Sequence, residues 1–357
     1  MLRVAVAGAG AFGRNHLRVY RELETDGQPV ALTAAVEPDE ARAAETAAKF
    51  SIPVFPSVEK LLSADLDLDA ASVAVPTVHH HAVASALLEA DLDLLVEKPL
   101  AGSLAEANDL LQLAAARDRI LQPGHLERFN PAVLAVQPQL RRPMFFEAHR
   151  LSIFTPRALD VDVVLDLMIH DLDIVLTFAN SPVREVRAVG LPILSPKVDI
   201  ANVRVEFESG CVANFTASRV STERVRKLRF FEPRQYVSID YARRDLLVIR
   251  LDGSVPPEIA AALEGGKLDP AVLAQLAAAS AAGGPGPGLS FAKPTVAPGE
   301  PLRLEIQSFL ESVRTRRAPR VTAHQGRDAL ALALEIQAAM AAHAERAGLQ
   351  DFFETGG

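Results

Sequence analysis

The first 122 residues alternate between short apolar runs and amphipathic segments with apolar positions at helical spacing. Such alternation of strand and helix patterns predicts a doubly wound α/β domain, in which a parallel sheet is covered by helices on both faces. The expected strands are 2–7, 30–36, 71–75, 92–96 and 120–122, and the expected helices are 14–23, 39–49, 81–90 and 104–117.

The pattern changes after Pro123-Gly124, which we interpret as the boundary between a domain of residues 1–122 and a second domain of residues 123–357. Consecutive strand patterns, interrupted by one helix at 161–178, predict an α/β domain with a large, mostly antiparallel, open sheet. Residues 256–298, with a Gly/Pro-rich stretch at 283–288, predict a surface excursion with one short Ala-rich helix and a flexible linker. The expected strands are 144–151, 183–191, 200–208, 211–220, 225–232, 235–240 and 245–250, and the expected C-terminal helices are 302–315 and 324–347.

A glycine-rich turn follows the first strand. Gly8, Gly10 and Gly13 form a Gly-x-Gly-x-x-Gly pattern between a strand and a helix, which is the layout of a dinucleotide-binding turn. In that layout the cofactor's phosphates bind N–H groups at the helix N-terminus, where the helix dipole favours negative charge. An ordinary glycine-rich loop is the alternative. The residues expected to contact the cofactor here are Gly8, Gly10, Ala11, Phe12, Gly13 and Arg14.

Glu37 lies at the end of the second expected strand. A carboxylate at that position accepts hydrogen bonds from the adenosine ribose hydroxyls and repels a 2′-phosphate, so NAD is favoured over NADP. No arginine follows Glu37 directly, which agrees with NAD. The alternative is a solvated loop acid.

Two further loops follow parallel strands and are therefore expected to line the ligand crevice. The first contains Pro76-Thr77 and three consecutive histidines; because neighbouring side chains point apart, we expect no metal there. The second is Glu97-Lys98-Pro99. A partly desolvated Lys98 can exchange protons with a substrate hydroxyl near neutral pH, and Glu97 would orient it or contact the nicotinamide.

Asp166 and His170 are four residues apart in the expected helix 161–178 and share a face, with Asp173 nearby. A carboxylate beside a histidine can raise the pKa of the histidine and hold its ring, which predicts an acid/base pair. A surface salt bridge is the alternative, and a metal site lacks a second histidine at suitable spacing.

Polar residues at the start of the second domain are candidates for substrate binding, because crevices between domains are preferred ligand sites. Arginine side chains supply planar forks for a diphosphate or a carboxylate, although a surface ion pair is an equally good interpretation of any one of them. The candidates for substrate binding are His125, Arg128, Asn130, Arg150, Arg157 and Asp173.

Composition excludes several classes of function. The net charge of −8 and the lack of a basic block with interleaved aromatics argue against nucleic-acid binding. Cys211 is the only cysteine, so an intrachain disulfide is impossible, and its place in a strand favours a small buried residue over a nucleophile. No apolar run reaches membrane-spanning length and the first strand begins at Leu2, so we expect a cytoplasmic protein without a signal peptide.

Taken together, these motifs resemble the glucose-fructose oxidoreductase / inositol dehydrogenase (Gfo/Idh/MocA) family over nearly the whole chain. The glycine turn, Pro76-Thr77 with His80, Glu97-Lys98-Pro99, and Asp166 with His170 occur in the family's order. The resemblance implies a Rossmann domain, NAD(P)-dependent oxidation of a sugar or polyol, and a homodimer or homotetramer formed through the open sheet. It also implies that Lys98 and His170 are the acid/base residues, with Asp166 their partner, and that Pro76, Thr77, His80, Glu97 and Lys98 contact the cofactor.

A narrower resemblance involves Gly124–Pro131 and Asp166–Asp173, which are similar to the branch that oxidises the 3-hydroxyl of UDP-N-acetylhexosamines. The sequence therefore predicts an NAD-dependent dehydrogenase of a nucleotide sugar such as UDP-N-acetylglucosamine. His170 is favoured as the base and Lys98 as the group that polarises the hydroxyl oxygen. The alternatives are a dehydrogenase of a free sugar or inositol, an NAD-dependent glycosidase of the same fold, and a non-catalytic protein that binds NAD or a metabolite.

Overall fold

The computed structural model describes residues 1–155, 161–251, 289–349 and 352. The chain divides into two compact units. The first combines Met1–Phe129 with Gly299–Glu335, and the second combines Asn130–Pro298 with Ile336–Gly357. The first unit therefore includes residues that follow the second in the sequence, whereas the sequence pattern suggested a division into 1–122 and 123–357.

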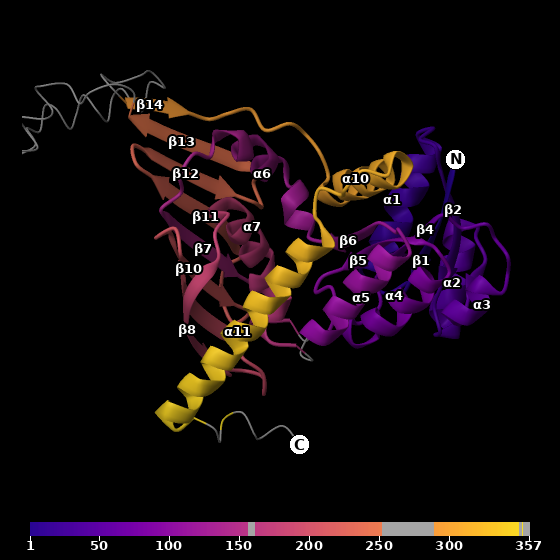
Figure 1. Cartoon of the computed structure of the whole chain (residues 1–357), viewed down its shortest axis with the longest axis horizontal. Coiled ribbons are helices and arrows are strands. Elements are labelled where there is room, and N and C mark those ends of the chain that lie inside the picture. The colour runs from indigo at the N-terminus through magenta and orange to yellow at the C-terminus, as the bar shows by residue number, and fades with distance from the viewer. Residues whose placement is uncertain (156–160, 252–288, 350–351, 353–357) are drawn as a thin grey trace, which may run out of the picture. The chain divides into compact units, whose positions relative to one another are not determined.

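The first unit is built on a six-stranded parallel sheet with strand order β3-β2-β1-β4-β5-β6 (Figure 1). This is the doubly wound order of dinucleotide-binding folds, and the order reverses between β1 and β4, which opens a ligand crevice at their carboxyl ends. The strands are β1 (Leu2–Ala7), β2 (Val30–Val36), β3 (Val54–Phe55), β4 (Ala70–Val73), β5 (Asp93–Glu97) and β6 (Leu121–Gly124).

Helices cover both faces of this sheet (Figure 1). On one face α1 and α10 pack together, and Leu17, Tyr20, Ile306 and Phe309 share one buried cluster with strand residues such as Leu95. On the other face α4 packs against α5. The helices are α1 (Gly13–Thr25), α2 (Glu40–Phe50), α3 (Val58–Leu62), α4 (His80–Glu89), α5 (Leu104–Ala116) and α10 (Pro301–Thr315).

The second unit contains an eight-stranded sheet with order β14-β13-β12-β11-β7-β10-β9-β8, in which every neighbouring pair except β7–β10 is antiparallel. Buried and half-exposed residues alternate along its strands, so one face packs on the core, as expected for an open antiparallel sheet. The strands are β7 (Phe145–Leu151), β8 (Val183–Leu191), β9 (Ile200–Phe207), β10 (Val212–Ser218), β11 (Val225–Glu232), β12 (Gln235–Asp240), β13 (Asp245–Leu251) and β14 (Leu289–Ala292).

The described residues of the second unit also form α6 (Pro131–Val136), α7 (Ile169–Ala179) and the part of α11 (Ala323–Ala347) from Ile336 onward. Gly190 of β8 lets α11 lie close to the sheet, because a Cβ there would stand 2.4 Å from Met340 Sδ. No helix in the described part of the chain is long and apolar enough to cross a membrane.

Beyond shifts at their ends, two of the predicted elements differ in the structure, and β3, α3 and α6 were not predicted. Strand β14 lies inside the predicted excursion 256–298 and pairs with β13, while the expected Ala-rich helix and the Gly/Pro-rich stretch 283–288 fall outside the described residues. The helix expected at 161–178 is interrupted, because Val164–Met168 form a π-helical turn before α7 begins.

Candidate functional site

The glycine turn connects β1 to α1 and lies beside the carboxyl ends of β2 and β4. Gly8 has φ of +95°, which only glycine adopts readily, and a Cβ there would lie 2.7 Å from the Ala74 carbonyl oxygen. At Gly13 a Cβ would lie 1.8 Å from the Gly8 carbonyl oxygen, so the first turn of α1 sits directly on the turn's backbone. Both positions therefore need glycine for the turn itself.

Gly10 differs, because a Cβ there would meet no described atom within 4 Å. The fold does not require glycine at this position, whereas a ligand that approaches the backbone closely does. The turn also precedes α1, whose N-terminal N–H groups favour an anion. These residues fit the pyrophosphate of a dinucleotide, in which Gly10 and the start of α1 would hold the phosphates.

Glu37 is fixed beside this turn by three hydrogen bonds. Its Oε2 accepts from the Ala9 N–H at 3.1 Å, and its Oε1 accepts from the Asp39 N–H at 3.0 Å and from the Arg42 guanidinium at 3.1 Å. The Glu37 side chain is only 4% exposed, whereas Arg42 is about half exposed. Sequence reasoning missed Arg42, which lies five residues after Glu37 and in the first turn of α2.

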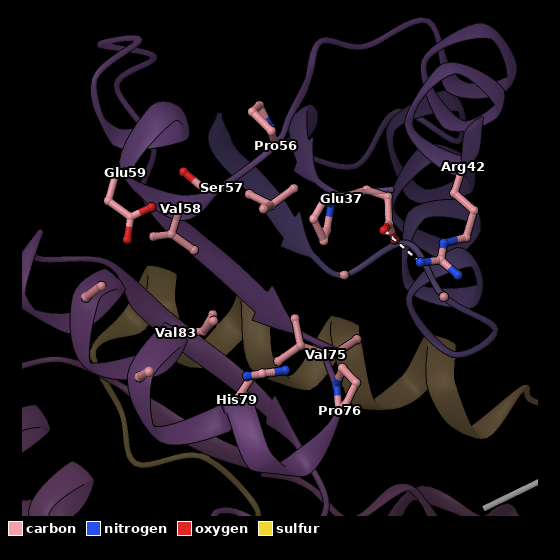
Figure 2. Close-up of a pocket in the computed structure, with 17 residues that line it drawn as sticks. Glu37, Arg42, Pro56, Ser57, Val58, Glu59, Val75, Pro76, His79 and Val83 are labelled. Carbon is pink, nitrogen blue, oxygen red and sulfur yellow. Dashed lines mark hydrogen bonds and ion pairs between the residues drawn. The ribbon is translucent and has the colours of Figure 1, made fainter. Parts of the chain in front are cut away.

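A cavity of about 520 Å³ opens beside Gly8, Gly10 and Glu37 (Figure 2). Figure 2 shows the paired Glu37 and Arg42 at one side of this cavity, and Ser57 and Glu59, from the start of α3, at another. Its apolar walls suit a flat aromatic base and its carboxylate suits ribose hydroxyls. The apolar walls include Val36, Val58, Val75, Pro76, Val83 and Ala86.

The three consecutive histidines face different surroundings. His79 lines the cavity (Figure 2), and His81 contacts Asp109 of α5 at 2.6 Å. His80 is buried, its ring nitrogens face the Pro99 and Val75 carbonyl oxygens at 2.8 and 2.9 Å, and burial lowers its pKa. His80 thus ties the loop after β4 to the loop after β5. Within the described ranges no three His, Cys, Asp or Glu side chains are grouped to hold a metal.

The remaining predicted cofactor contacts lie around these loops. Pro76 lines the cavity, and the 3₁₀ turn Thr77–His79 follows it. Phe12 is 43% exposed and its ring lies 6.3 Å from that of His16. The Arg14 guanidinium contacts Glu45 of α2 at 3.4 Å.

Glu97 and Lys98 stand at the carboxyl end of β5. The Glu97 carboxylate accepts a hydrogen bond from the Lys98 N–H at 3.3 Å and contacts His16 Nε2 at 2.9 Å. His16 Nδ1 in turn contacts Ser72 Oγ at 3.1 Å, and Ser72 Oγ contacts the Tyr20 hydroxyl at 2.9 Å. Sequence reasoning missed this chain of buried polar groups. The available signal was a histidine three residues after Gly13 on the buried face of a helix.

In the second unit, the π-helical turn carries Asp166, and the first turn of α7 carries His170. Both residues are half-buried. The turn is anchored by Asp162, which accepts hydrogen bonds from the Val164 and Leu165 N–H groups and from Gln337. π-helical turns occur frequently at functional sites.

Arg150 and Asp171 form a buried bidentate ion pair, with Nε–Oδ2 at 2.7 Å and an NH2–Oδ1 contact at 3.0 Å. The Arg150 guanidinium also lies 5.2 Å from the centre of the Tyr241 ring. Arg150 was predicted to bind substrate. In the structure its fork is engaged by Asp171, and the pair fastens the start of α7 to β7.

The other predicted substrate residues are placed as follows. Asn130 caps α6 by accepting from the Ala132 N–H, and it donates to the Tyr241 carbonyl at 3.3 Å. In the first unit His125 is buried, and buried Arg128 approaches the Arg320 carbonyl oxygen at 3.5 Å. Asp173 is buried in α7, and Arg157 lies outside the described residues.

A second buried ion pair anchors the turn between β8 and β9. Asp199 accepts hydrogen bonds from three consecutive backbone N–H groups, residues 193–195, and from the Ser195 hydroxyl and Arg219 Nε. Burial opposes ionisation of Asp199, but these hydrogen bonds outweigh it and hold its pKa well below the usual range. Cys211 is buried and burial raises its pKa to about 11, so it lacks the thiolate character of a nucleophile.

Comparison with known proteins gives evidence of the family that is independent of the site's geometry. The family model described as "Oxidoreductase family, NAD-binding Rossmann fold" matches residues 2–125, and that of the "GFO/IDH/MocA C-terminal domain" matches residues 132–234. A UDP-N-acetylglucosamine 3-dehydrogenase from Acidithiobacillus ferrooxidans is 32% identical over 97% of this chain and 99% of its own length. Its crystal structure matches with a TM-score of 0.81, covering 96% of this chain and 98% of the other.

More distant proteins share parts of the chain or the fold alone. An inositol 2-dehydrogenase from Acidothermus cellulolyticus is 31% identical over 53% of this chain and 56% of its own. A levoglucosan dehydrogenase in complex with NADH and L-sorbose has a TM-score of 0.79 at 16% identity, covering 95% of this chain and 96% of the other. That likeness concerns the fold.

Proposed function

Because this chain belongs to the Gfo/Idh/MocA family of NAD-binding oxidoreductases, we propose that it oxidises the 3-hydroxyl of a UDP-N-acetylhexosamine, such as UDP-N-acetylglucosamine, to a ketone. The observation that carries this proposal is the similarity to a UDP-N-acetylglucosamine 3-dehydrogenase across nearly the full length of both chains. The inositol dehydrogenases match 52% to 62% of this chain, which makes an inositol the second candidate substrate.

The first unit supplies the cofactor site in this proposal. Gly10 and the start of α1 would hold the pyrophosphate, Glu37 the adenosine ribose, and the apolar walls of the cavity the adenine. When bound, NAD⁺ supplies the hydride acceptor.

We propose NAD over NADP because the ribose end of the site is acidic. Glu37, Asp39 and Glu40 lie together at the start of α2, and Arg42 is already engaged by Glu37. A 2′-phosphate would meet a buried carboxylate there, whereas ribose hydroxyls would donate hydrogen bonds to it.

Two residues promote the removal of the hydroxyl proton in the proposed reaction. His170, in the first turn of α7, acts as general base toward the reacting hydroxyl, with Asp166 as its partner. Lys98, at the carboxyl end of β5, polarises the hydroxyl oxygen and stabilises negative charge on it as the C–H bond breaks. Positioning of the sugar contributes the rest, because hydride transfer needs near contact of donor and acceptor carbons.

We further propose that the outer face of the eight-stranded sheet joins copies of this chain into a homodimer or homotetramer. Half-exposed Phe145, Phe231 and Tyr236 stack on this face, with ring centres 5.4 and 5.1 Å apart, and Phe146 and Phe230 face the core. Phe231→Asp should shift the mass measured by light scattering to that of a monomer; an unchanged mass would refute this interface.

An NADH-absorbance screen over UDP-N-acetylhexosamines, free hexoses and inositols tests the proposed activity. We expect stoichiometric NADH formation with UDP-N-acetylglucosamine and a keto product that a hydrazine traps. Turnover with inositol alone would assign the second candidate substrate. Hydrolysis without net NADH would indicate an NAD-dependent glycosidase, and cofactor binding without turnover on any sugar would indicate a non-catalytic protein.

A further inference from the structure

A chain of four buried polar side chains runs from the interior of the first unit to the residue before Lys98. It consists of Tyr20, Ser72, His16 and Glu97, with successive contacts of 2.9, 3.1 and 2.9 Å. Tyr20, Ser72 and His16 are fully buried, and Glu97 is 7% exposed. A run of this kind is not needed to complete the core, because apolar side chains of similar volume would fill it without polar groups to satisfy.

We propose that His16 is a positioning residue for the reaction: it fixes the Glu97 carboxylate, and Glu97 in turn fixes the backbone from which the Lys98 side chain extends. The inference rests on the proposed function, in which Lys98 polarises the reacting hydroxyl. His16 itself is not assigned any contact with substrate or cofactor.

The hydrogen-bond pattern defines one tautomer of His16. Glu97 Oε1 is an acceptor, so His16 Nε2 carries the hydrogen and donates to it. In the neutral ring Nδ1 is then an acceptor and receives the Ser72 hydroxyl hydrogen, which leaves Ser72 Oγ to accept from the Tyr20 hydroxyl. Every group in the chain is satisfied with His16 neutral, and burial raises the pKa of Tyr20, which keeps its hydroxyl protonated as a donor.

Glu97 connects the His16 ring to the backbone of Lys98. Its second carboxylate oxygen accepts from the Lys98 N–H at 3.3 Å, so the side chain is held between a ring on α1 and the backbone of the next residue. A Cβ at Gly124 would lie 3.1 Å from Glu97 Oε1, so glycine at this position in β6 leaves the carboxylate the space that it occupies. His16 is therefore the donor that selects one rotamer of Glu97.

The position of His16 in α1 means that its contact with Glu97 connects two parts of the proposed active site. His16 lies one turn after Gly13, in the helix whose first turn is expected to bind the cofactor's phosphates. Glu97 is the last residue of β5, which lies two strands from β1 in the sheet, and Lys98 follows it. The His16–Glu97 contact thus links the phosphate-binding helix to the segment that carries the proposed catalytic lysine.

Substitutions at the contact test the positioning role. His16→Phe keeps a ring of similar size and removes both hydrogen bonds, so kcat should fall about 10–100-fold while the Kd for NAD changes less than about threefold. His16→Gln retains a donor that can reach Glu97 and should recover most of kcat. The matched control is His81→Phe. His81 pairs with Asp109 and takes no part in the row of hydrogen-bonded side chains that includes His16, so this substitution should leave kcat unchanged.

A double-mutant cycle separates positioning from a general structural effect. Glu97→Leu should lower kcat as His16→Phe does, and the double variant should be no worse than the more impaired single variant, because each substitution removes the His16–Glu97 contact. Additive losses, a kcat of His16→Phe within twofold of wild type, or a loss of NAD affinity equal to the loss of kcat would overturn the proposal. Turnover is measured on whichever substrate the wild-type enzyme oxidises in the screen.

Nitrogen NMR of histidine side chains provides a readout that needs no substrate. In wild-type protein, with the His16 signal assigned through His16→Gln, we expect the Nε2–H tautomer, and Glu97→Gln should shift that signal. An Nδ1–H tautomer or an unmoved signal would overturn the contact. A failed substrate screen together with the expected tautomer would instead reject only the proposed substrate and leave the contact in place.

Discussion

Replacing Glu37 is expected to change the choice between NAD and NADP. Glu37 is 4% exposed, and its charge is opposed by Arg42 at 3.1 Å. Two like unit charges about 4 Å apart repel by about 4 kcal/mol at an effective dielectric constant of about 20 and by about 1 kcal/mol in water. Because Arg42 is half exposed and offsets part of this repulsion, we expect Glu37 to disfavour a 2′-phosphate by about 1.5–3 kcal/mol, or about 10–100-fold.

Two variants of Glu37 separate its charge from its hydrogen bonds. Glu37→Gln removes the charge and keeps one acceptor oxygen, for either the Ala9 or the Asp39 N–H group, whereas Glu37→Ala removes the charge and both acceptors. In each, the ratio of kcat/KM for NAD to that for NADP should fall about 10–100-fold. Glu37→Ala should also weaken NAD itself, because two backbone donors beside the glycine turn lose their partner.

Arg42→Ala serves as the opposing variant. Removing this guanidinium leaves the Glu37 charge uncompensated, so the preference for NAD should increase by about 3–10-fold. Steady-state kinetics with both cofactors, and calorimetric Kd values that do not depend on turnover, measure these ratios. Two results would show that Glu37 does not belong to the ribose site. One is an unchanged NAD/NADP ratio of kcat/KM in both Glu37 variants, and the other is a fall of this ratio in Arg42→Ala as well as in the Glu37 variants.

Three further predictions concern the reaction and the fold. Lys98→Ala and His170→Ala should each lose most turnover while the calorimetric Kd for NAD is kept; near-wild-type turnover in both would reject their assignment. A Cβ at Gly13 would overlap the turn's backbone and one at Gly10 would meet open space, so Gly13→Ala should lower the melting temperature and NAD binding together, whereas Gly10→Ala should lower NAD binding alone. The pKa of Asp199 is depressed in the folded state, so its contribution to stability is present above pH of about 4 and is lost as pH falls below that value. Asp199→Asn should lower the urea-derived free energy of unfolding by about 3–5 kcal/mol at neutral pH and flatten the acid limb of the stability curve; an unchanged acid limb would contradict the assignment.

Strands with strong local patterns were predicted with their observed bounds. β2, β8 and β12 occupy the residues expected from their apolar runs and flanking turns, and the open antiparallel sheet follows from the alternation along β7 to β13. The glycine turn and the acid at the end of β2 also lie together as expected, because the geometry of a strand–turn–helix unit is local. The motifs resembled the Gfo/Idh/MocA family, and the family models confirm that resemblance.

Features that depend on partners far apart in the sequence were not predicted. β3 is two residues long and leaves no periodicity to detect. The arginine fork of Arg150 is occupied by Asp171, a partner that only the packing of α7 on β7 brings within reach. The π-helical turn at Val164–Met168 adds no distinct residue pattern, since its apolar positions also fit a regular helix.

The return of α10 to the first unit bears on how the chain matures during synthesis. Leu302, Ile306 and Phe309 complete the same buried cluster as Tyr20 and residues of the parallel sheet. The ribosome must therefore synthesise the whole eight-stranded sheet before α10 can complete the core of the first unit. A nascent chain that stops before Gly299 would leave the apolar residues of this cluster exposed to solvent and prone to association. Expression of a chain that stops before Gly299 should yield aggregated protein. Adding a peptide that spans α10 should restore a non-aggregated, protease-resistant form.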